Sequence, residues 1–124
     1  MKKIIFLVTL SATILVFSSF KNETSMHYVH VNVQDAKGSE LFHAKGCALC
    51  HAPEKQIVGP SLKEIANAYK GDVNKVLEFM NQKRKPIVNP EEFKYMQPVL
   101  GELKRMKPEE RKALATYYMS FYKK

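Results

Sequence analysis

The sequence predicts a small all-α fold. From residue 35 onward, apolar residues recur at the spacing of amphipathic helices. Capping residues, glycines and prolines divide this pattern into separate segments. The alternation that marks a strand is weak and confined to residues 30–33, so no sheet is predicted. With 124 residues, the chain is long enough for one small domain.

The first two predicted helices have clear boundary signals. One helix is expected over residues 35–45 and ends at Gly46, because glycine readily adopts the conformation that closes a helix. The other begins at Ser61, which together with Glu64 has the spacing of a capping box. This second helix is expected to stop at Gly71.

Two further helices complete the prediction. Asp72 is a good N-cap for a helix whose apolar stripe consists of Val73, Val76, Leu77 and Met80. Pro108 begins the last helix, whose apolar stripe consists of Ala113, Leu114, Tyr117, Tyr118 and Phe121. Long loops are expected after residues 51 and 83, because Pro86, Pro90 and Pro98 interrupt the helical pattern.

The N-terminus has the pattern of a targeting segment. Lys2 and Lys3 precede an almost unbroken apolar run from Ile4 to Phe17. This run is shorter than the roughly 20 residues of a membrane span and suits the apolar region of a signal peptide. We therefore predict a signal peptide or uncleaved N-terminal anchor at 1–20, a polar leader at 21–34 and a folded domain at 35–124.

The chain is basic, with a formal net charge of +8. Loss of Lys2 and Lys3 with a cleaved signal peptide would leave +6. The positive residues are spread along the sequence and are densest at Lys83–Lys85. Because an exported protein seldom meets nucleic acid, we expect an acidic protein or an anionic membrane surface as the partner, and no nucleic acid.

The chemistry of the sequence is concentrated in Cys47-Ala48-Leu49-Cys50-His51. C-x-x-C-H is the attachment signature of c-type haem. Two intervening residues let both sulfurs reach the two vinyl groups on one side of a porphyrin. The histidine after the second cysteine is then brought under the iron. The sequence therefore predicts one covalent haem c, attached at Cys47 and Cys50 with His51 as an axial iron ligand.

Three other uses of paired cysteines fit less well. A thioredoxin-like redox pair belongs in a βαβ setting, which this sequence lacks. A structural zinc site needs four ligands, but the chain has only two cysteines, and His27, His30 and His43 are scattered upstream. A disulfide across two residues would add little stability, because so short a loop removes little chain entropy.

Together with this motif, residues 38–121 resemble a small class I cytochrome c of the bacterial single-haem type. The features that carry the resemblance occur in the expected order: Gly38 and Phe42, the motif, Gly59-Pro60-Ser61-Leu62, and Leu114 with Tyr117. The resemblance implies the cytochrome c fold, in which several helices wrap around one covalent haem c. It also implies that the first and last helices cross at Gly38, with Phe42 and Tyr117 packed at the crossing.

The resemblance also assigns two further site residues. The carbonyl of Pro60 is expected to accept a hydrogen bond from Nδ1–H of His51 and so orient the proximal ligand. A methionine from the loop before the last helix is expected as the sixth ligand. Met96 is favoured, because Pro98 follows it closely, and Met106 is the second candidate. Met80 and Met119 are assigned to the core. The loop from Met96 to Pro108 is long for the family and leaves room for a helical turn over 99–104.

The resemblance implies an electron-transfer protein and not an enzyme. His/Met ligation fills both axial positions and raises the reduction potential, because the soft thioether favours Fe(II). We expect single electrons to pass between respiratory partners in the periplasm, with the protein soluble or membrane-tethered. Partner docking is expected to involve cationic residues, with Lys45, Lys55, Lys83, Arg84, Lys85 and Lys94 as candidates. The alternatives are a haem-bearing subunit of a larger oxidase or dehydrogenase, and a peroxidase-like haem enzyme.

Overall fold

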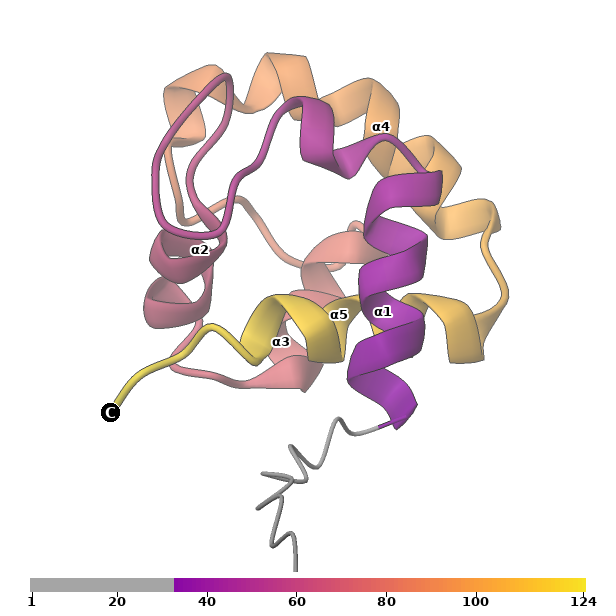
Figure 1. Cartoon of the computed structure of the whole chain (residues 1–124). Helices are drawn as coiled ribbons and strands as arrows, with labels where there is room; N and C mark the ends of the chain where they lie inside the picture. The colour runs from indigo at the N-terminus through magenta and orange to yellow at the C-terminus, as the bar shows by residue number, and fades with distance from the viewer. Residues whose placement is uncertain (1–32) are drawn as a thin grey trace, which may run out of the picture.

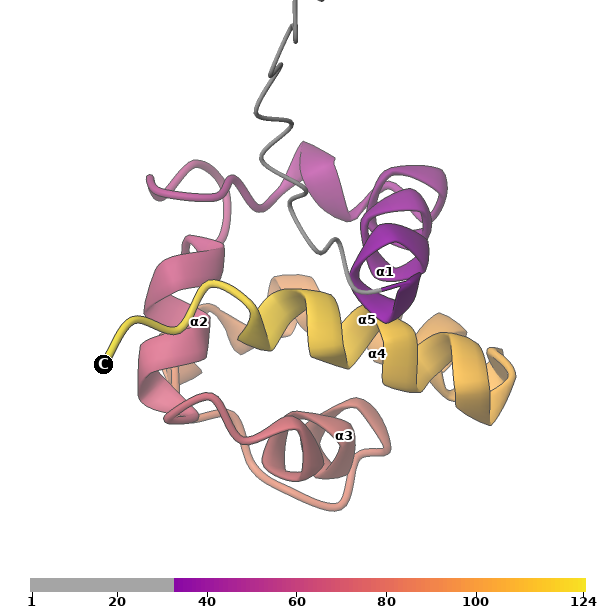
Figure 2. The same ribbon diagram turned by 60° about the horizontal axis from the view of Figure 1, so that its bottom comes forward.

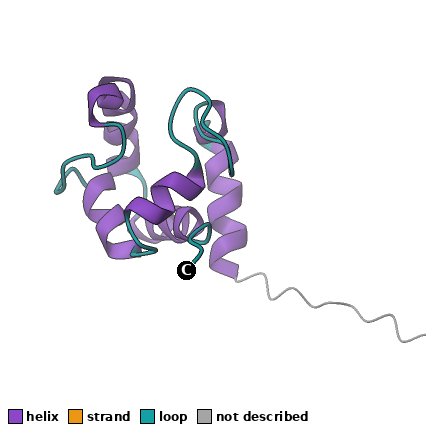
Figure 3. Cartoon of the chain, turned by 90° about the vertical axis from the view of Figure 1, so that its left-hand side faces the viewer, coloured by secondary structure: helices purple, strands orange, loops and turns teal. Residues whose placement is uncertain are grey.

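The computed structural model describes residues 33–124. The predicted targeting segment 1–20 and residues 21–32 of the predicted leader lie outside the described residues. The described part is helical, which confirms the all-α prediction, and its one strand-like feature is an isolated bridge between His51 and Gln56 (Figure 3). None of the helices within 33–124 has the length and apolarity needed to cross a membrane.

The first and last helices cross closely, as the family resemblance implies. Helix α1 spans Val33–Ala44 and helix α5 spans Pro108–Met119, and Figure 2 shows α1 lying across α5. Gly38 permits the contact, because a Cβ there would collide with the carbonyl oxygen of Ala113 and lie 2.5 Å from Cβ of Tyr117. The rings of Phe42 and Tyr117 pack beside the crossing, with centroids 5.5 Å apart. Helix α1 begins two residues earlier than the predicted Asp35.

Helices α2 and α3 form where local capping signals predict them. Helix α2 spans Leu62–Ala68, and both hydrogen bonds of the capping box between Ser61 and Glu64 are present. Helix α3 spans Val73–Met80, and the side chain of Asp72 accepts hydrogen bonds from two backbone N–H groups of its first turn. Figure 1 shows α2 at the C-terminal end of α5, and Figure 2 shows α3 lying alongside α5.

The prediction of an irregular loop around Met96 is wrong. A short 3-10 turn, η2 (Pro90–Glu92), leads directly into helix α4, which spans Phe93–Arg105 and contains both Met96 and Pro98. Pro98 and Lys94 are both exposed. The Lys94 carbonyl that loses its helical partner can therefore be hydrated, which makes the proline tolerable.

The opposite face of α4 supplies the apolar stripe that holds the helix in place. This stripe has helical spacing and consists of Phe93, Met96, Leu100 and Leu103. Leu100 and Leu103 are each only 3% exposed. Burial of this face therefore outweighs the helix-breaking tendency of Pro98, and the predicted turn over 99–104 is part of a longer helix.

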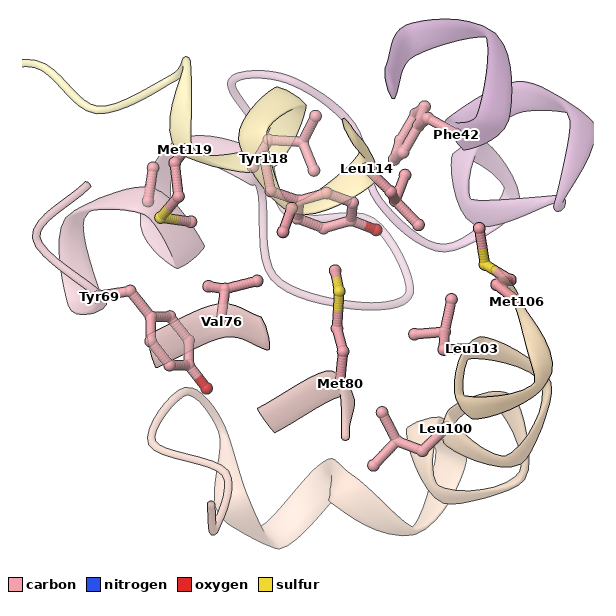
Figure 4. Close-up of a cluster of buried hydrophobic side chains, with 13 residues drawn as sticks. Phe42, Tyr69, Val76, Met80, Leu100, Leu103, Met106, Leu114, Tyr118 and Met119 are labelled. Carbon is pink, nitrogen blue, oxygen red and sulfur yellow. The ribbon is translucent and has the colours of Figure 1, made fainter. Parts of the chain in front are cut away.

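One cluster of buried side chains joins the helices. Figure 4 shows side chains from α1, α3, α4 and α5 converging on it. Its labelled members include Phe42, Val76, Met80, Leu103 and Leu114. Fully burying a side chain of this kind contributes roughly 1.5–3 kcal/mol. The cluster forms one wall of the cavity described next.

Candidate haem site

The Cys47–His51 segment is a tight turn set by its neighbours. Gly46 has a left-handed backbone (φ 72°), so α1 ends and the 3-10 turn η1 (Cys47–Leu49) begins at once. The carbonyl oxygen of Cys47 accepts hydrogen bonds from the N–H groups of Cys50 at 3.1 Å and His51 at 3.0 Å. This geometry brings both cysteines and the histidine to the border of one cavity.

His51 is held in the form that a metal ligand needs. Its side chain is buried, and Nδ1 lies 2.7 Å from the carbonyl oxygen of Pro60. A carbonyl can only accept, so Nδ1 carries the proton and Nε2 keeps a free lone pair. Burial lowers the pKa of His51, while the hydrogen bond to Pro60 acts in the opposite direction. The neutral imidazole that can bind iron is therefore favoured at neutral pH.

The loop after the motif fixes the position of Pro60. The Gly59 N–H donates to the carbonyl oxygen of Cys50 at 2.7 Å, and the Leu62 N–H donates to that of Ala52 at 2.9 Å. Gly59 lies directly against the imidazole, because a Cβ at this position would be 2.7 Å from Cε1 of His51. Gly59 belongs to the family pattern, but the sequence alone does not predict this contact.

The cavity has the apolar lining that a haem requires. It encloses about 1120 Å³ of space free of protein atoms, part of which is open solvent. Its walls are largely apolar and include Ile65, Val76, Phe79, Met80, Val99 and Leu103. The residues present therefore fit the group: two thiols and an imidazole on one border, and an apolar interior for the porphyrin.

The two predicted sixth ligands lie in different surroundings. Met96 is half-buried and borders the cavity. Met106 is 8% exposed and lies in the core cluster, but it does not border the cavity. Met80, which we assigned to the core, is buried as expected but also borders the cavity (Figure 4). The second methionine at the cavity is therefore Met80 and not Met106, so Met80 is the alternative to Met96 as sixth ligand.

Two tyrosines bordering the cavity were not predicted as site residues. Tyr69 follows α2, and Tyr118 lies on α5. Burial raises the pKa of Tyr69 to about 12 and that of Tyr118 well above its usual range. The sequence contained a signal, because each tyrosine places a hydroxyl within an otherwise apolar stripe. The sequence alone does not show that these side chains border the cavity, because this depends on how the helices pack.

Of the six predicted docking cations, only Lys45 borders the cavity. Lys45 is exposed and borders the cavity. The other five candidates, Lys55, Lys83, Arg84, Lys85 and Lys94, do not border it. Arg84 is paired with Glu78 at 2.7 Å. Exposed apolar side chains also occur at the border, among them Val58, Ile87 and Tyr95.

The geometry also bears on the other uses of paired cysteines. Within residues 33–124, no three His, Cys, Asp or Glu side chains are grouped so that they could hold a metal ion. The two cysteines are not joined by a disulfide. The βαβ setting of a thioredoxin-like site is missing from the described part of the chain. Both cysteines instead border the apolar cavity, which suits the attachment of a haem.

Comparison with known proteins agrees with this geometry. The family model described as cytochrome c matches residues 36–121, well over half of the chain. Over 34 residues the chain is 50% identical to cytochrome c-551 of Azotobacter vinelandii, covering 27% of this chain and 42% of that protein. Over 36 residues it is 50% identical to cytochrome c2 of Rubrivivax gelatinosus, covering 29% and 42%. The matched stretch thus spans about two fifths of these relatives.

Proteins of this family hold a haem c through two thioether bonds, and the cavity bordered by Cys47, Cys50 and His51 fits that group. The family match extends from the first helix to the residues just after the last. The chain therefore belongs to the cytochrome c family, and its cofactor is a covalently bound haem c.

Proposed function

We propose that the protein carries single electrons on a haem c attached at Cys47 and Cys50, with His51 and Met96 as axial iron ligands. The observation that carries this proposal is the shared cavity. Both cysteines and His51 border it, and so does Met96 on α4. The family match and the likeness to cytochromes c-551 and c2 also favour electron transfer over catalysis.

The surrounding residues suit this function. The bound haem would supply the one-electron Fe(III)/Fe(II) couple. The Pro60 carbonyl holds the His51 ring and raises its basicity through the 2.7 Å hydrogen bond. The apolar walls exclude water and limit rearrangement between redox states. A Met96 thioether would favour Fe(II), because it is a soft ligand.

A peroxidase-like enzyme fits the cavity less well. Such an enzyme needs an open axial position and a distal acid–base group. Among the described residues that border the cavity, His51 is the only histidine, and its Nδ1 already donates to Pro60. The arrangement therefore offers no second imidazole for proton transfer on the opposite side.

We further propose an exported protein that meets acidic redox partners. The support for export is the targeting pattern at residues 1–20, which is a property of the sequence. The support for an acidic partner is the positive charge of the folded part, together with exposed Lys45 at the cavity border. A free periplasmic carrier and a haem-bearing subunit of a larger oxidase or dehydrogenase share this site and differ in their permanent partners.

Substitution of Met96 tests the ligand assignment. In the oxidised holoprotein, Met96→Ala should abolish the weak charge-transfer band of sulfur-to-iron ligation at the red end of the visible spectrum. It should also lower the reduction potential and open the iron to carbon monoxide. A haem stain after denaturing electrophoresis should still detect the cofactor, because Cys47 and Cys50 are unchanged.

Two matched controls accompany this variant. Met106→Ala should keep the band, the potential and the resistance to carbon monoxide, and should lose about 2–5 kcal/mol of stability through the core cavity it leaves. Met80→Leu should keep the band as well. Loss of the band in Met80→Leu, with the band intact in Met96→Ala, would assign the ligand to Met80. If the wild type shows no such band, His/Met ligation is wrong.

A further inference from the structure

The side chain of Arg111 joins the last helix to the end of α4. Arg111 lies near the start of α5 and is half-buried. Its Nη1 donates to the carbonyl oxygen of Leu103 at 2.9 Å and to that of Lys104 at 2.8 Å. The carbonyl oxygen of Met106 lies 3.4 Å from the same nitrogen. One guanidinium group therefore gathers the carbonyls at the C-terminal end of α4.

These carbonyls need partners from outside their own helix. The last four C=O groups of an α-helix lack the usual N–H partner four residues further on. Helix α4 ends at Arg105, so Leu103 and Lys104 belong to this group. The residue four positions after Lys104 is Pro108, which has no N–H to donate. The charged guanidinium supplies the missing donors and faces the negative end of the helix dipole.

The same bonds attach α4 to the rigid part of the molecule. Helix α5 packs closely on α1, α2 and α3, and less extensively on α4. The hydrogen-bond ladder of α4 is also interrupted at Pro98, because proline has no N–H. Helix α4 is therefore the helix whose position depends most on side-chain bonds such as those of Arg111.

The end that Arg111 holds is in register with Met96. Leu103 follows Met96 by seven residues, about two helical turns, so both side chains lie on one face of α4. Both side chains border the cavity. A shift or rotation of the C-terminal end of α4 would therefore move Met96 relative to the opposite border of the cavity, where His51 lies.

We propose that Arg111 is a positioning residue that keeps Met96 within reach of the iron held by His51. The inference rests on the proposed function, in which Met96 is the sixth ligand. Helix α5 is the frame that both ligands share. The His51 ring packs against Tyr118 of α5, with centroids 6.1 Å apart, and Arg111 ties α4 to the same helix. Loss of these hydrogen bonds lets α4 move away with Met96, while the covalent attachment at the two cysteines stays intact.

Arg105 provides a matched control at the same end of α4. It is exposed and pairs with Glu102 one turn earlier on its own helix, so this ion pair does not involve α5. Arg111→Met and Arg105→Met each remove one guanidinium group and one positive charge, and each leaves an unbranched side chain that suits a helix. Only the first substitution removes the link between the two helices.

The experiment measures carbon monoxide binding to the reduced, haem-loaded wild type and variants. Carbon monoxide must displace the sixth ligand, so its apparent affinity rises with the fraction of molecules in which Met96 is detached. Arg111→Met should bind carbon monoxide about two- to tenfold more tightly, the range for the net effect of one hydrogen bond. Arg105→Met should match the wild type. In a Met96→Ala background, Arg111→Met should cause no further increase, because no sixth ligand remains to be positioned.

Each outcome decides one point. Unchanged affinity in Arg111→Met, or an equal increase in the Met96→Ala background, would overturn this inference and leave the proposed function intact. A wild type without the sulfur-to-iron band would instead overturn the His/Met ligation on which the proposed function rests. If Arg111→Met does not retain haem, NMR of the wild type decides. The guanidinium protons of Arg111 should exchange with solvent more slowly than those of Arg105, and equal exchange rates would contradict the hydrogen bonds.

Discussion

Gly59 shows how closely the backbone is fitted to the proximal histidine. The residue before Pro60 lies against the ring, so the segment that supplies the accepting carbonyl also limits how far the ring can rotate. The hydrogen bond sets the orientation of His51, and the backbone at Gly59 blocks movement to one side. Both constraints favour a fixed ligand.

We therefore predict that Gly59→Ala displaces the His51 ring. The added Cβ would lie 2.7 Å from Cε1 and 3.1 Å from Nδ1, so either the ring or the loop must move. Overpacking of this kind costs roughly 1–3 kcal/mol. The variant should unfold at lower denaturant concentration, and the NMR signal of the Nδ1 proton should shift or broaden as the bond to Pro60 weakens.

Gly46→Ala is the control for this effect. Gly46 has a positive φ, and the nearest atom to an added Cβ is Cδ1 of Leu49 at 3.6 Å. The variant should therefore lose stability through backbone strain alone, by about 1 kcal/mol. Its Nδ1 proton signal should resemble that of the wild type. An unperturbed Nδ1 proton in Gly59→Ala would contradict the steric argument.

At the scale of helices, boundaries set by local signals were predicted correctly. Features that depend on packing between distant parts of the chain were not predicted from the residue pattern. Gly46, Ser61 and Asp72 mark their boundaries through bonds to residues within a few positions, so one sequence was sufficient to predict them. The family resemblance supplied the α1–α5 crossing and the Pro60 carbonyl, which spacing alone does not give.

The failure at α4 has the opposite cause. Pro98 is a local signal against a helix, and the sequence prediction followed it instead of the apolar stripe formed by Phe93, Met96, Leu100 and Leu103. The free energy gained by burying that stripe depends on the residues that pack against it, and these come from distant parts of the chain. The contact between the rings of Tyr118 and His51 could not be predicted for the same reason, because it joins α5 to the motif.

Helix α4 also contains a glycine that tests its intrinsic stability. Gly101 lies within the helix, and a Cβ there would have no heavy atom within 4 Å. Gly101→Ala should therefore raise the free energy of unfolding by about 0.5–1 kcal/mol, because alanine loses less backbone entropy. Chemical denaturation of the haem-loaded protein measures the change.

The same substitution at Gly38 should have the opposite sign. An added Cβ would enter the α1–α5 crossing, between the Ala113 carbonyl and Tyr117. Gly38→Ala should lower the free energy of unfolding by about 1–3 kcal/mol. Neither helix can move away without losing the contact between Phe42 and Tyr117. Equal effects at the two glycines would show that the crossing is not the close contact described.

At the scale of the whole molecule, the excess of positive charge is spread over the surface. The ion pairs among the described residues are exposed or partly exposed, as in Lys63–Glu54 at 3.0 Å and Arg84–Glu78 at 2.7 Å. Such pairs contribute about 0–1 kcal/mol each. The charge is therefore better explained by encounter with a partner than by stability, and Lys45 at the cavity border is the cation best placed to affect that encounter.

We predict that electron exchange with an acidic partner slows as salt is added. Between ionic strengths of about 0.01 M and about 0.15 M the Debye length falls from roughly 30 Å to roughly 8 Å, which screens long-range attraction. Stopped-flow reduction of the protein by a membrane preparation provides the rate. Lys45→Glu should slow the reaction at low salt, and the difference from the wild type should shrink as salt rises.

Lys112→Glu is the matched control, because Lys112 is exposed on α5 and does not border the cavity, and the substitution changes the net charge by the same amount. A larger effect of Lys45→Glu means that the partner is guided to the cavity opening, where the distance to the haem is short. Equal effects would mean that net charge alone acts. A rate that does not respond to salt would exclude electrostatic steering, and docking would then depend on the exposed apolar side chains of Val58, Ile87 and Tyr95 at the same border.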